Sequence, residues 1–121
     1  MKTRKNLQKF IKNKLSENES NRNEVLVALR NLVGQVLKLY PTVNRIAVVG
    51  SIASGNFSSN SDVDIVVRGL EKNDYFKLYN FLESNLAREI DLIVEEELSE
   101  EDRKHIMHKQ EIIYDLEKNR C

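Results

Sequence analysis

The stretch Val48–Val67, VVGSIASGNFSSNSDVDIVV, decides how the rest of the chain folds. An apolar run ends at Gly50-Ser51, a loop of small residues follows, and a second apolar run opens on Asp62 and Asp64. Short, nearly continuous apolar runs that stop at glycine are typical of buried strands. The pattern therefore predicts two strands joined by a small-residue loop, with two carboxylates at the start of the second strand.

Helix and strand patterns continue on both sides of this stretch. Apolar residues recur at helical spacing in the segments 1–15, 24–40 and 74–86. Ser99 as an N-cap, with Asp102 three residues on, predicts a further helix over residues 99–108. The polar run SENESNRN (residues 16–23) predicts a break between the first two helices. Apolar runs at 89–94 and 111–114 predict two further strands. This order predicts a small α/β domain, and we assign residues 1–22 to an N-terminal helical extension and residues 23–121 to the domain itself.

Composition and charge limit the classes of function. The chain of 121 residues has a formal net charge of zero, so its charge gives only weak support for nucleic-acid binding. Residues 1–15 carry six basic and no acidic side chains, and residues 89–102 carry eight acidic and no basic ones. We interpret these runs first as solvated faces and second as surfaces for a partner. No apolar run approaches the ~20 residues that span a bilayer, so we expect a cytoplasmic protein without membrane contact.

The carboxylates point to a metal site. Because side chains alternate across a strand, Asp62 and Asp64 are expected to share one face. Asp91 lies in another apolar strand pattern, EIDLIV (residues 89–94), and three carboxylates converge if the two strands are neighbours. Like charges that lie so close resist ionising together unless a cation offsets them. Oxygen ligands suit Mg²⁺, and two such ions can hold the attacking and leaving oxygens of a phosphoryl displacement.

Gly50-Ser51 fits a phosphate-binding role beside these acids. Glycine lets the backbone approach a phosphate closely, and backbone N–H groups and a serine hydroxyl donate to phosphate oxygens. The loop is not a Walker loop, because no Gly-Lys-Ser/Thr follows. Phe57 in the same loop either packs within it or touches a nucleotide base. His105 and His108, three apart on a predicted helix, are interpreted as a surface pair rather than a metal-binding pair.

The residues of this loop resemble the nucleotidyltransferase superfamily of DNA polymerase β type. The pattern is Gly-Ser, ten residues and then Asp-x-Asp, and residues 50–64 match it without adjustment. GSIASG followed by SDVDIVV is similar to the minimal nucleotidyltransferases of bacteria and archaea, and Asp91 fits the third acid. The resemblance covers about residues 24–115. It implies the nucleotidyltransferase fold, a small mixed α/β (α+β) sheet packed by helices.

The resemblance also implies a role for each matching residue. The implied nucleotide-binding residues are Gly50, Ser51 and Ser61. The implied catalytic and metal-binding residues are Asp62, Asp64 and Asp91. Two Mg²⁺ ions are the implied cofactors, and ATP or another NTP is the implied substrate. The implied reaction transfers a nucleoside monophosphate to a hydroxyl and releases pyrophosphate, with Asp91 assisting removal of the hydroxyl proton.

A protein partner is implied as well. Minimal members are often paired with a small helical HEPN protein, as the antitoxin half of a toxin–antitoxin pair, and some transfer AMP to a tyrosine of the toxin. Many relatives have arginine after the Gly-Ser pair, where this chain has Ile52 and Ser54. Since the loop has no positive charge, we expect the metal ions, Arg68 or residues outside the motif to neutralise the triphosphate.

Three functions are compatible with the sequence. The leading one is a Mg²⁺-dependent nucleotidyltransferase that modifies a hydroxyl of a protein partner, as an antitoxin. The second is a non-catalytic antitoxin module that binds a nucleotide or a partner, and the uncharged loop motivates it. The third is a small-molecule adenylyltransferase of the antibiotic-modifying kind, in which a homo-oligomer would supply the acceptor-binding surface that this single domain lacks.

Overall fold

The computed structural model describes residues 3–118, with side chains placed for Lys9 and for residues 17–118. The helices and strands are α1 (Thr3–Leu39), β1 (Arg45–Val49), α2 (Ser51–Ser54), β2 (Val63–Arg68), α3 (Tyr75–Leu86), β3 (Ile90–Val94), α4 (Glu100–Ile106) and β4 (Glu111–Asp115). Apart from Lys9, which is exposed, the basic side chains of residues 1–15 lie outside the described part, so their predicted role as a solvated face or a partner surface stays a prediction. Although α1 spans 37 residues, neither it nor another described helix has the apolar stretch needed to cross a bilayer.

The strands form one mixed sheet in the order β3-β2-β1-β4. Strand β1 is antiparallel to β2 and to β4, whereas β2 and β3 are parallel. Parallel neighbours need a crossover connection, and α3 supplies it. The first residues of β2 and β3 therefore lie beside the last residues of β1, at one end of the strands. The predicted α/β fold with a small mixed sheet is confirmed.

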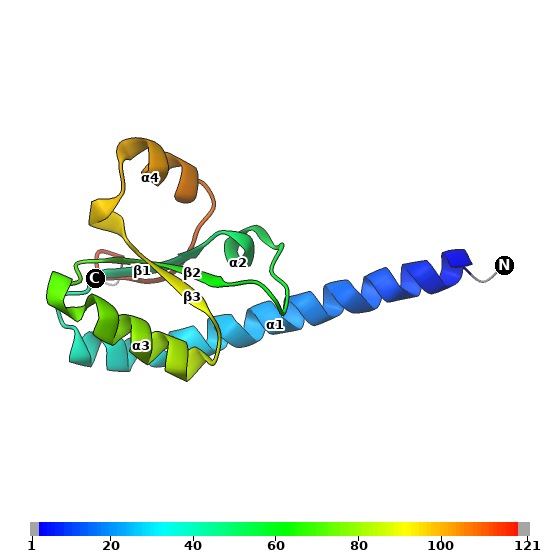
Figure 1. Cartoon of the computed structure of the whole chain (residues 1–121), viewed down its shortest axis with the longest axis horizontal. Coiled ribbons are helices and arrows are strands. Elements are labelled where there is room, and N and C mark those ends of the chain that lie inside the picture. The colour runs from blue at the N-terminus through cyan, green and yellow to red at the C-terminus, as the bar shows by residue number, and fades with distance from the viewer. Residues whose placement is uncertain (1–2, 119–121) are drawn as a thin grey trace.

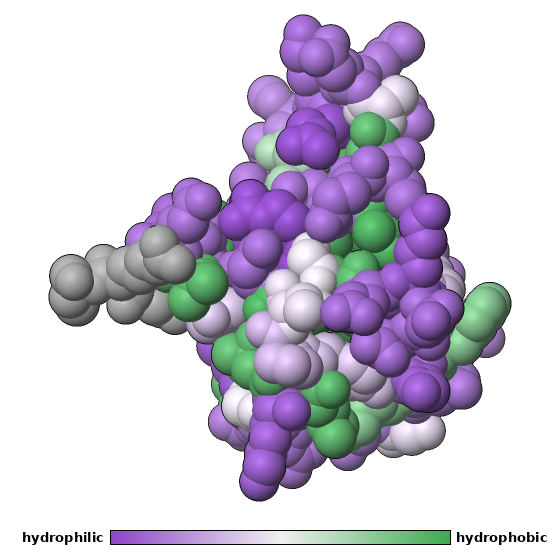
Figure 2. Space-filling view, turned by 90° about the vertical axis from the view of Figure 1, so that its left-hand side faces the viewer, coloured by the Kyte–Doolittle hydropathy of each residue, from purple (hydrophilic) through white to green (hydrophobic). Residues whose placement is uncertain are grey.

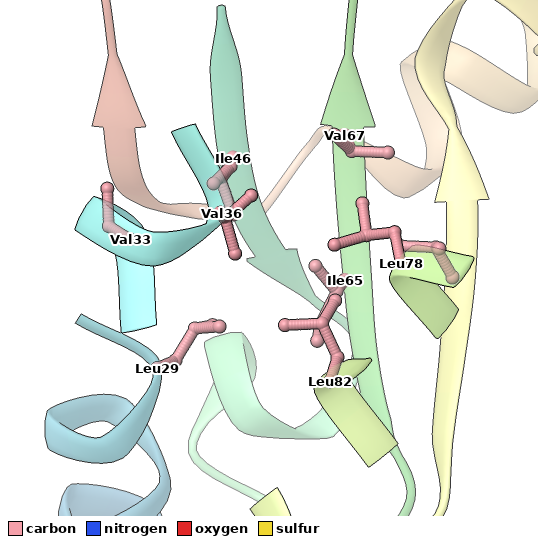
Figure 3. A pocket seen from close by; sticks show the side chains of 9 residues that line it. Leu29, Val33, Val36, Ile46, Ile65, Val67, Leu78 and Leu82 are labelled. Atoms are coloured by element: carbon pink, nitrogen blue, oxygen red, sulfur yellow. The ribbon is translucent and has the colours of Figure 1, made fainter. Parts of the chain in front are cut away.

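The hydrophobic core lies between the sheet and two helices. Helices α1 and α3 cover one face of the sheet, and α4 lies on the opposite side (Figure 1). Leu29 from α1, Ile65 from β2 and Leu78 from α3 are each 1% exposed and converge in this layer (Figure 3). They line a void of about 10 Å³ whose walls are entirely apolar. A space so small and without polar partners holds no ordered water or ligand, so it is a packing defect of the core.

The predicted break at residues 16–23 is wrong, because α1 runs through this segment without interruption. The segment contains neither glycine nor proline, and each of its residues costs less than about 1 kcal/mol relative to alanine in a helix. Glu19 and Arg22 also form an ion pair at 3.8 Å across one turn. The first half of α1 projects away from the domain (Figure 1). The boundary between residues 22 and 23 falls inside this helix, so the division into extension and domain stays a proposal.

A buried network of ion pairs lies at the other end of the strands, where β1 begins and where β2, β3 and β4 end. Arg45 is 6% exposed, donates to Glu95 at 3.0 Å and lies 3.5 Å from Asp115. Arg68 approaches the same two carboxylates at 3.7 and 3.9 Å. Arg103 of α4 reaches Glu95 at 3.9 Å. These contacts tie α4 to the ends of the strands and hold it over one face of the sheet.

Candidate active site

The predicted acids come together where β1 ends and where β2 and β3 begin. In the sheet register, Val49 lies opposite Asp64, and Asp64 lies opposite Asp91. Ile65 and Leu92, the next residues of these two strands, belong to the buried core. Side chains alternate along a strand, so Asp64 and Asp91 lie on the other face of the sheet. The two acidic strands are neighbours, which is the condition on which the convergence of the carboxylates depended.

The carboxylate of Asp64 is held in an unfavourable electrostatic environment. Its partial burial raises the pKa of this carboxyl above the ordinary value, and the negative charges of Asp91 and Asp62 raise it further. Asp62 is exposed and precedes β2, although the sequence predicted it inside the strand. Asp91 and Asp62 are thus both within electrostatic reach of Asp64. Of the three acids, Asp64 lies in β2 and Asp91 in β3, whereas Asp62 lies outside the strands.

The chemistry of these side chains suits a hard divalent cation. A partly buried carboxylate beside two like charges is a group whose ionised form such a cation stabilises. Among residues 3–118, however, no three His, Cys, Asp or Glu side chains are already arranged to hold a metal ion. Asp64 and Asp91 line the same cleft, and Asp62 is not one of its lining residues. Coordination of Mg²⁺ by all three acids therefore stays a proposal.

Gly50 connects the end of β1 to this acidic edge. Its φ of 70° lies in the left-handed region that side chains rarely adopt. A Cβ atom built on Gly50 would overlap the Oδ2 atom of Asp64. The glycine thus allows the backbone to pass directly beside the carboxylate. The close approach to a phosphate that the sequence predicted for this position stays a prediction.

We expect a Gly50→Ala variant to lose about 1–2 kcal/mol of stability from the left-handed backbone alone. Because the new methyl group must also displace Asp64, nucleotidyl transfer should fall by about 10²-fold. Gly55→Ala is the matched control, since Gly55 has a φ of 90° but open space around its Cβ position. Chemical denaturation should show a loss of stability for both variants that is larger for Gly50→Ala, and an activity assay should show a loss of transfer for Gly50→Ala only. Equal activity losses in both variants would contradict this role of Gly50.

A cleft of about 430 Å³ opens between the acidic edge and α4. This volume lies within the usual range of small-ligand sites, about 300–1,000 Å³. One side of the cleft is lined by Val49, Gly50, Ser54, Asp64, Asp91 and Ile93. The other side comes from α4 and the turn after it and is lined by His105, Ile106, His108 and Lys109. The cleft therefore combines carboxylates on the sheet with basic side chains on α4 and the turn after it.

The loop that follows Gly50 is braced by its own residues. Ser51 begins α2, and its carbonyl oxygen accepts backbone hydrogen bonds from Gly55 and Asn56 at 3.1 Å. The Ser61 hydroxyl accepts from the backbone N–H of Ser58 at 3.0 Å and so closes the far side of the loop. Neither Ser51 nor Ser61 lines the cleft. Nucleotide binding by these two serines stays a prediction.

Of the two roles considered for Phe57, packing within the loop and contact with a nucleotide base, the structure supports packing. Its side chain is 1% exposed, and the Arg88 guanidinium lies 4.8 Å from the centre of its ring. Arg88 also donates to the Ser59 carbonyl at 3.4 Å. Phe57 is therefore an anchor of the loop and has no surface left for a nucleotide base. His105 and His108 are exposed, as predicted for a surface pair.

Of the three sources of positive charge considered from the sequence, the structure places Arg68 away from the acids. Arg68 is the last residue of β2, whereas Asp64 lies near its beginning. Its guanidinium donates to the Asn44 side chain at 2.7 Å and belongs to the buried network with Glu95 and Asp115. Sequence proximity to the acidic motif was misleading, because consecutive strand residues advance about 3.3 Å each along the sheet.

Sequence reasoning missed the residues that other elements bring to this region. Arg22, assigned to the extension, donates from Nε to the Ile52 carbonyl at 2.7 Å and pairs with Glu111 at 2.6 Å. It thereby fixes the loop to α1 and β4. Lys109 lines the cleft, although nothing in its own stretch of sequence signals a site. No local motif could reveal either residue, since both reach the loop only through the tertiary fold.

A family model described as nucleotidyltransferase domain matches residues 29–119. The chain therefore belongs to the nucleotidyltransferase domain family, as its Gly-Ser and Asp-x-Asp residues suggested. No curated protein matches the sequence.

Solved structures with the same fold include several minimal nucleotidyltransferases. A chain from a toxin–antitoxin complex with AMP-PNP has a TM-score of 0.63 and 22% identity, covering 74% of this chain and 76% of that one. A protein described as a minimal nucleotidyltransferase has a TM-score of 0.59 and 27% identity, with coverages of 72% and 91%. A chain from the complex of a tri-AMPylated Shewanella oneidensis HEPN toxin with its MNT antitoxin has a TM-score of 0.52 and 20% identity, with coverages of 84% and 76%.

Proposed function

We propose that this chain is a Mg²⁺-dependent nucleotidyltransferase that transfers AMP from ATP to a hydroxyl of a protein partner, as an antitoxin. The observation that carries the proposal is the pairing of Asp64 with Asp91 in the sheet register, beside Gly50, within one cleft of nucleotide size. Family membership supports the reaction type. A cytoplasmic location agrees with a substrate such as ATP.

The reaction requires an oxygen nucleophile, a leaving group and compensation for negative charge. The acceptor hydroxyl oxygen bonds to the α-phosphorus, the bond from that phosphorus to the bridging oxygen breaks, and pyrophosphate leaves. Asp91 is exposed at the cleft and takes the hydroxyl proton. Asp62, Asp64 and Asp91 would hold Mg²⁺, which supplies the positive charge that lets phosphate oxygens approach these acids. Gly50 and Ser51 contribute backbone and hydroxyl donors to the phosphates.

Two observations support a protein as the acceptor. Similar folds occur in complexes described as toxin–antitoxin pairs, including one in which the HEPN toxin is tri-AMPylated. Phe76 is 75% exposed and packs edge-on against Tyr75 at 5.3 Å, next to a hollow that Leu70 and Val94 also line. Figure 2 shows the end of the molecule opposite the projecting part of α1, where hydrophobic side chains lie among hydrophilic ones. The hollow is also lined by the charged residues Glu71, Lys72 and Glu97, and exposed apolar side chains rimmed by charged ones are typical of protein interaction sites.

The test uses ATP labelled at either the α- or the γ-phosphate. The protein is purified together with the partner that it binds in its own cell and is then incubated with Mg·ATP. We expect the α-label to appear on the partner and the γ-label to leave with pyrophosphate. Transfer of the γ-label would indicate a phosphoryl transferase, and absence of both labels from the partner would contradict the proposed function.

The second candidate is a non-catalytic antitoxin that acts by covering its partner. It is favoured by residues 50–61, which contain no basic side chain to bind a triphosphate. This version predicts that the partner is inhibited equally well with and without ATP, and that Asp64→Asn inhibits as well as the wild type. The catalytic proposal predicts that inhibition by catalytic amounts of the chain requires Mg·ATP.

A further inference from the structure

The Gly-Ser loop, which forms one side of the proposed nucleotide cleft, contributes no basic side chain. No lysine or arginine occurs between Gly50 and Ser61, and Arg68 lies at the other end of β2. The acids of the cleft and a triphosphate together carry more negative charge than two divalent ions offset. A further positive charge is needed, and the rest of the fold must provide it.

The arginines around the cleft are already engaged. Arg22 binds the Ile52 carbonyl and the Glu111 carboxylate at 2.7 and 2.6 Å. Arg88 lies over the ring of Phe57. Of the other arginines, Arg45 at the start of β1 is buried against Glu95 at 3.0 Å, and Arg103 of α4 lies 3.9 Å from the same carboxylate. Releasing any of these side chains would leave a polar or charged group unpaired, so none is available to a ligand without loss of folding energy.

Lys109 differs from these arginines. It lines the same cleft as Gly50, Asp64 and Asp91, from the opposite wall, and it is exposed. With Lys9 and residues 17–118, whose side chains the structure describes, its ammonium group forms no hydrogen bond or ion pair. Its ammonium group is therefore free to bind an anion that enters between α4 and the sheet.

The wall that carries Lys109 is anchored to the rest of the fold by residues before and after it. Gln110, the next residue, accepts a hydrogen bond of 2.6 Å from the buried guanidinium of Arg45. At the other end of α4, the Ser99 hydroxyl caps the helix by accepting from the Asp102 N–H at 3.1 Å. Arg103 reaches the Glu95 carbonyl at 3.4 Å. These anchors hold the wall in position, so Lys109 is presented to the cleft by a supported turn.

We propose that Lys109 binds the phosphate groups of the nucleotide across the cleft from Gly50, and so replaces the positive charge that the Gly-Ser loop lacks. This inference rests on the proposed function, because it assigns a specificity residue to the same site. A charge at this position favours a triphosphate over a monophosphate, since its attraction grows with the charge of the ligand. Lys109 is thus a binding residue that distinguishes ATP from AMP.

The test measures dissociation constants by calorimetry for Mg·ATP and for AMP. Lys109→Ala is expected to weaken binding of Mg·ATP by about tenfold or more, because a charge-assisted contact is lost, and to change AMP binding much less. Lys109→Arg, which keeps the charge, should bind Mg·ATP nearly as well as the wild type. Lys104→Ala is the matched control, because Lys104 is an exposed lysine of α4 that does not line the cleft.

The outcomes separate this inference from the function on which it rests. If the wild type binds Mg·ATP and Lys109→Ala binds it equally well, the role of Lys109 is overturned while the proposed function stands. If Lys109→Ala and Lys104→Ala weaken binding by the same factor, the effect is one of general charge and the role is likewise overturned. A wild type that binds no Mg·ATP would overturn the inference and the proposed function together.

Discussion

An Asp64→Asn variant is expected to lose nucleotidyl transfer by about 10³-fold or more while becoming more stable than the wild type. The activity falls because this carboxylate is the acid that its strand places at the cleft, in the space that Gly50 leaves open. The stability rises because the folded protein keeps a carboxylate partly buried beside Asp91 and Asp62, which raises its pKa. Asparagine has nearly the same shape and carries no charge, so it removes this repulsion.

The pH dependence of the stability difference follows from the sign of that shift. The folded state binds the Asp64 proton more tightly than the unfolded state does, so the contribution of Asp64 to stability is lost as pH rises through the raised pKa. The stability gain of Asp64→Asn should therefore be full at neutral pH and should shrink as pH falls toward the ordinary aspartate pKa of about 3.9. Thermal melting at several pH values measures this. Glu117→Gln is the control, because Glu117 is an exposed acid far along the chain from this motif. A melting temperature below that of the wild type at neutral pH would contradict the account of Asp64.

A Glu95→Ala variant is expected to lose about 3–5 kcal/mol of stability, the largest loss that we predict for an exchange of one side chain. Glu95 is 4% exposed and faces Arg45 at 3.0 Å, Arg68 at 3.7 Å and Arg103 at 3.9 Å. Its removal leaves Arg45 and Arg68 with the single carboxylate of Asp115 and takes away the carboxylate partner of Arg103. A buried charge without its partner is far more costly than the loss of an exposed ion pair.

Urea denaturation provides the measurement for Glu95→Ala. The matched control is Glu97→Ala in the same short turn, because Glu97 is exposed and should change stability by about 0.5 kcal/mol or less. We also expect Glu95→Ala to weaken ATP binding, since the network supports α4 and the turn that carries Lys109. If Glu95→Ala and Glu97→Ala unfold at the same urea concentration, the buried network does not have the structural role described here.

The part of the site that could be predicted from the sequence is the part that one local motif encodes. Two apolar runs around a small-residue loop specify two adjacent strands, and the strand period places Asp64 opposite to the core residue Ile65. Asp91 followed from the same pattern in a separate strand, because a parallel crossover brings strand starts together. Gly50 was predictable because close backbone approach to a charged site is a property of glycine alone.

The errors arose where tertiary contacts decide the structure. A polar run without glycine or proline has no strong preference for helix or loop. In residues 16–23 the contacts of Arg22 with Ile52 and Glu111 favour the helix. Arg68 is close to the motif in sequence, but it lies at the far end of β2 from Asp64. Lys109 is distant in sequence, and only the packing of α4 over the sheet brings it to the cleft. A single sequence contains no local signal for contacts of this kind.

The central claim is that the cleft between Gly50, Asp64 and α4 catalyses transfer of a nucleoside monophosphate. The most direct measurement is the intact mass of the partner that co-purifies with the chain, taken before and after addition of Mg·ATP. The claim predicts that the partner gains the mass of one or more AMP groups with the wild type, and that it gains none in the same time with Asp64→Asn. An unchanged partner mass with the wild type, or an equal gain with Asp64→Asn, would contradict it.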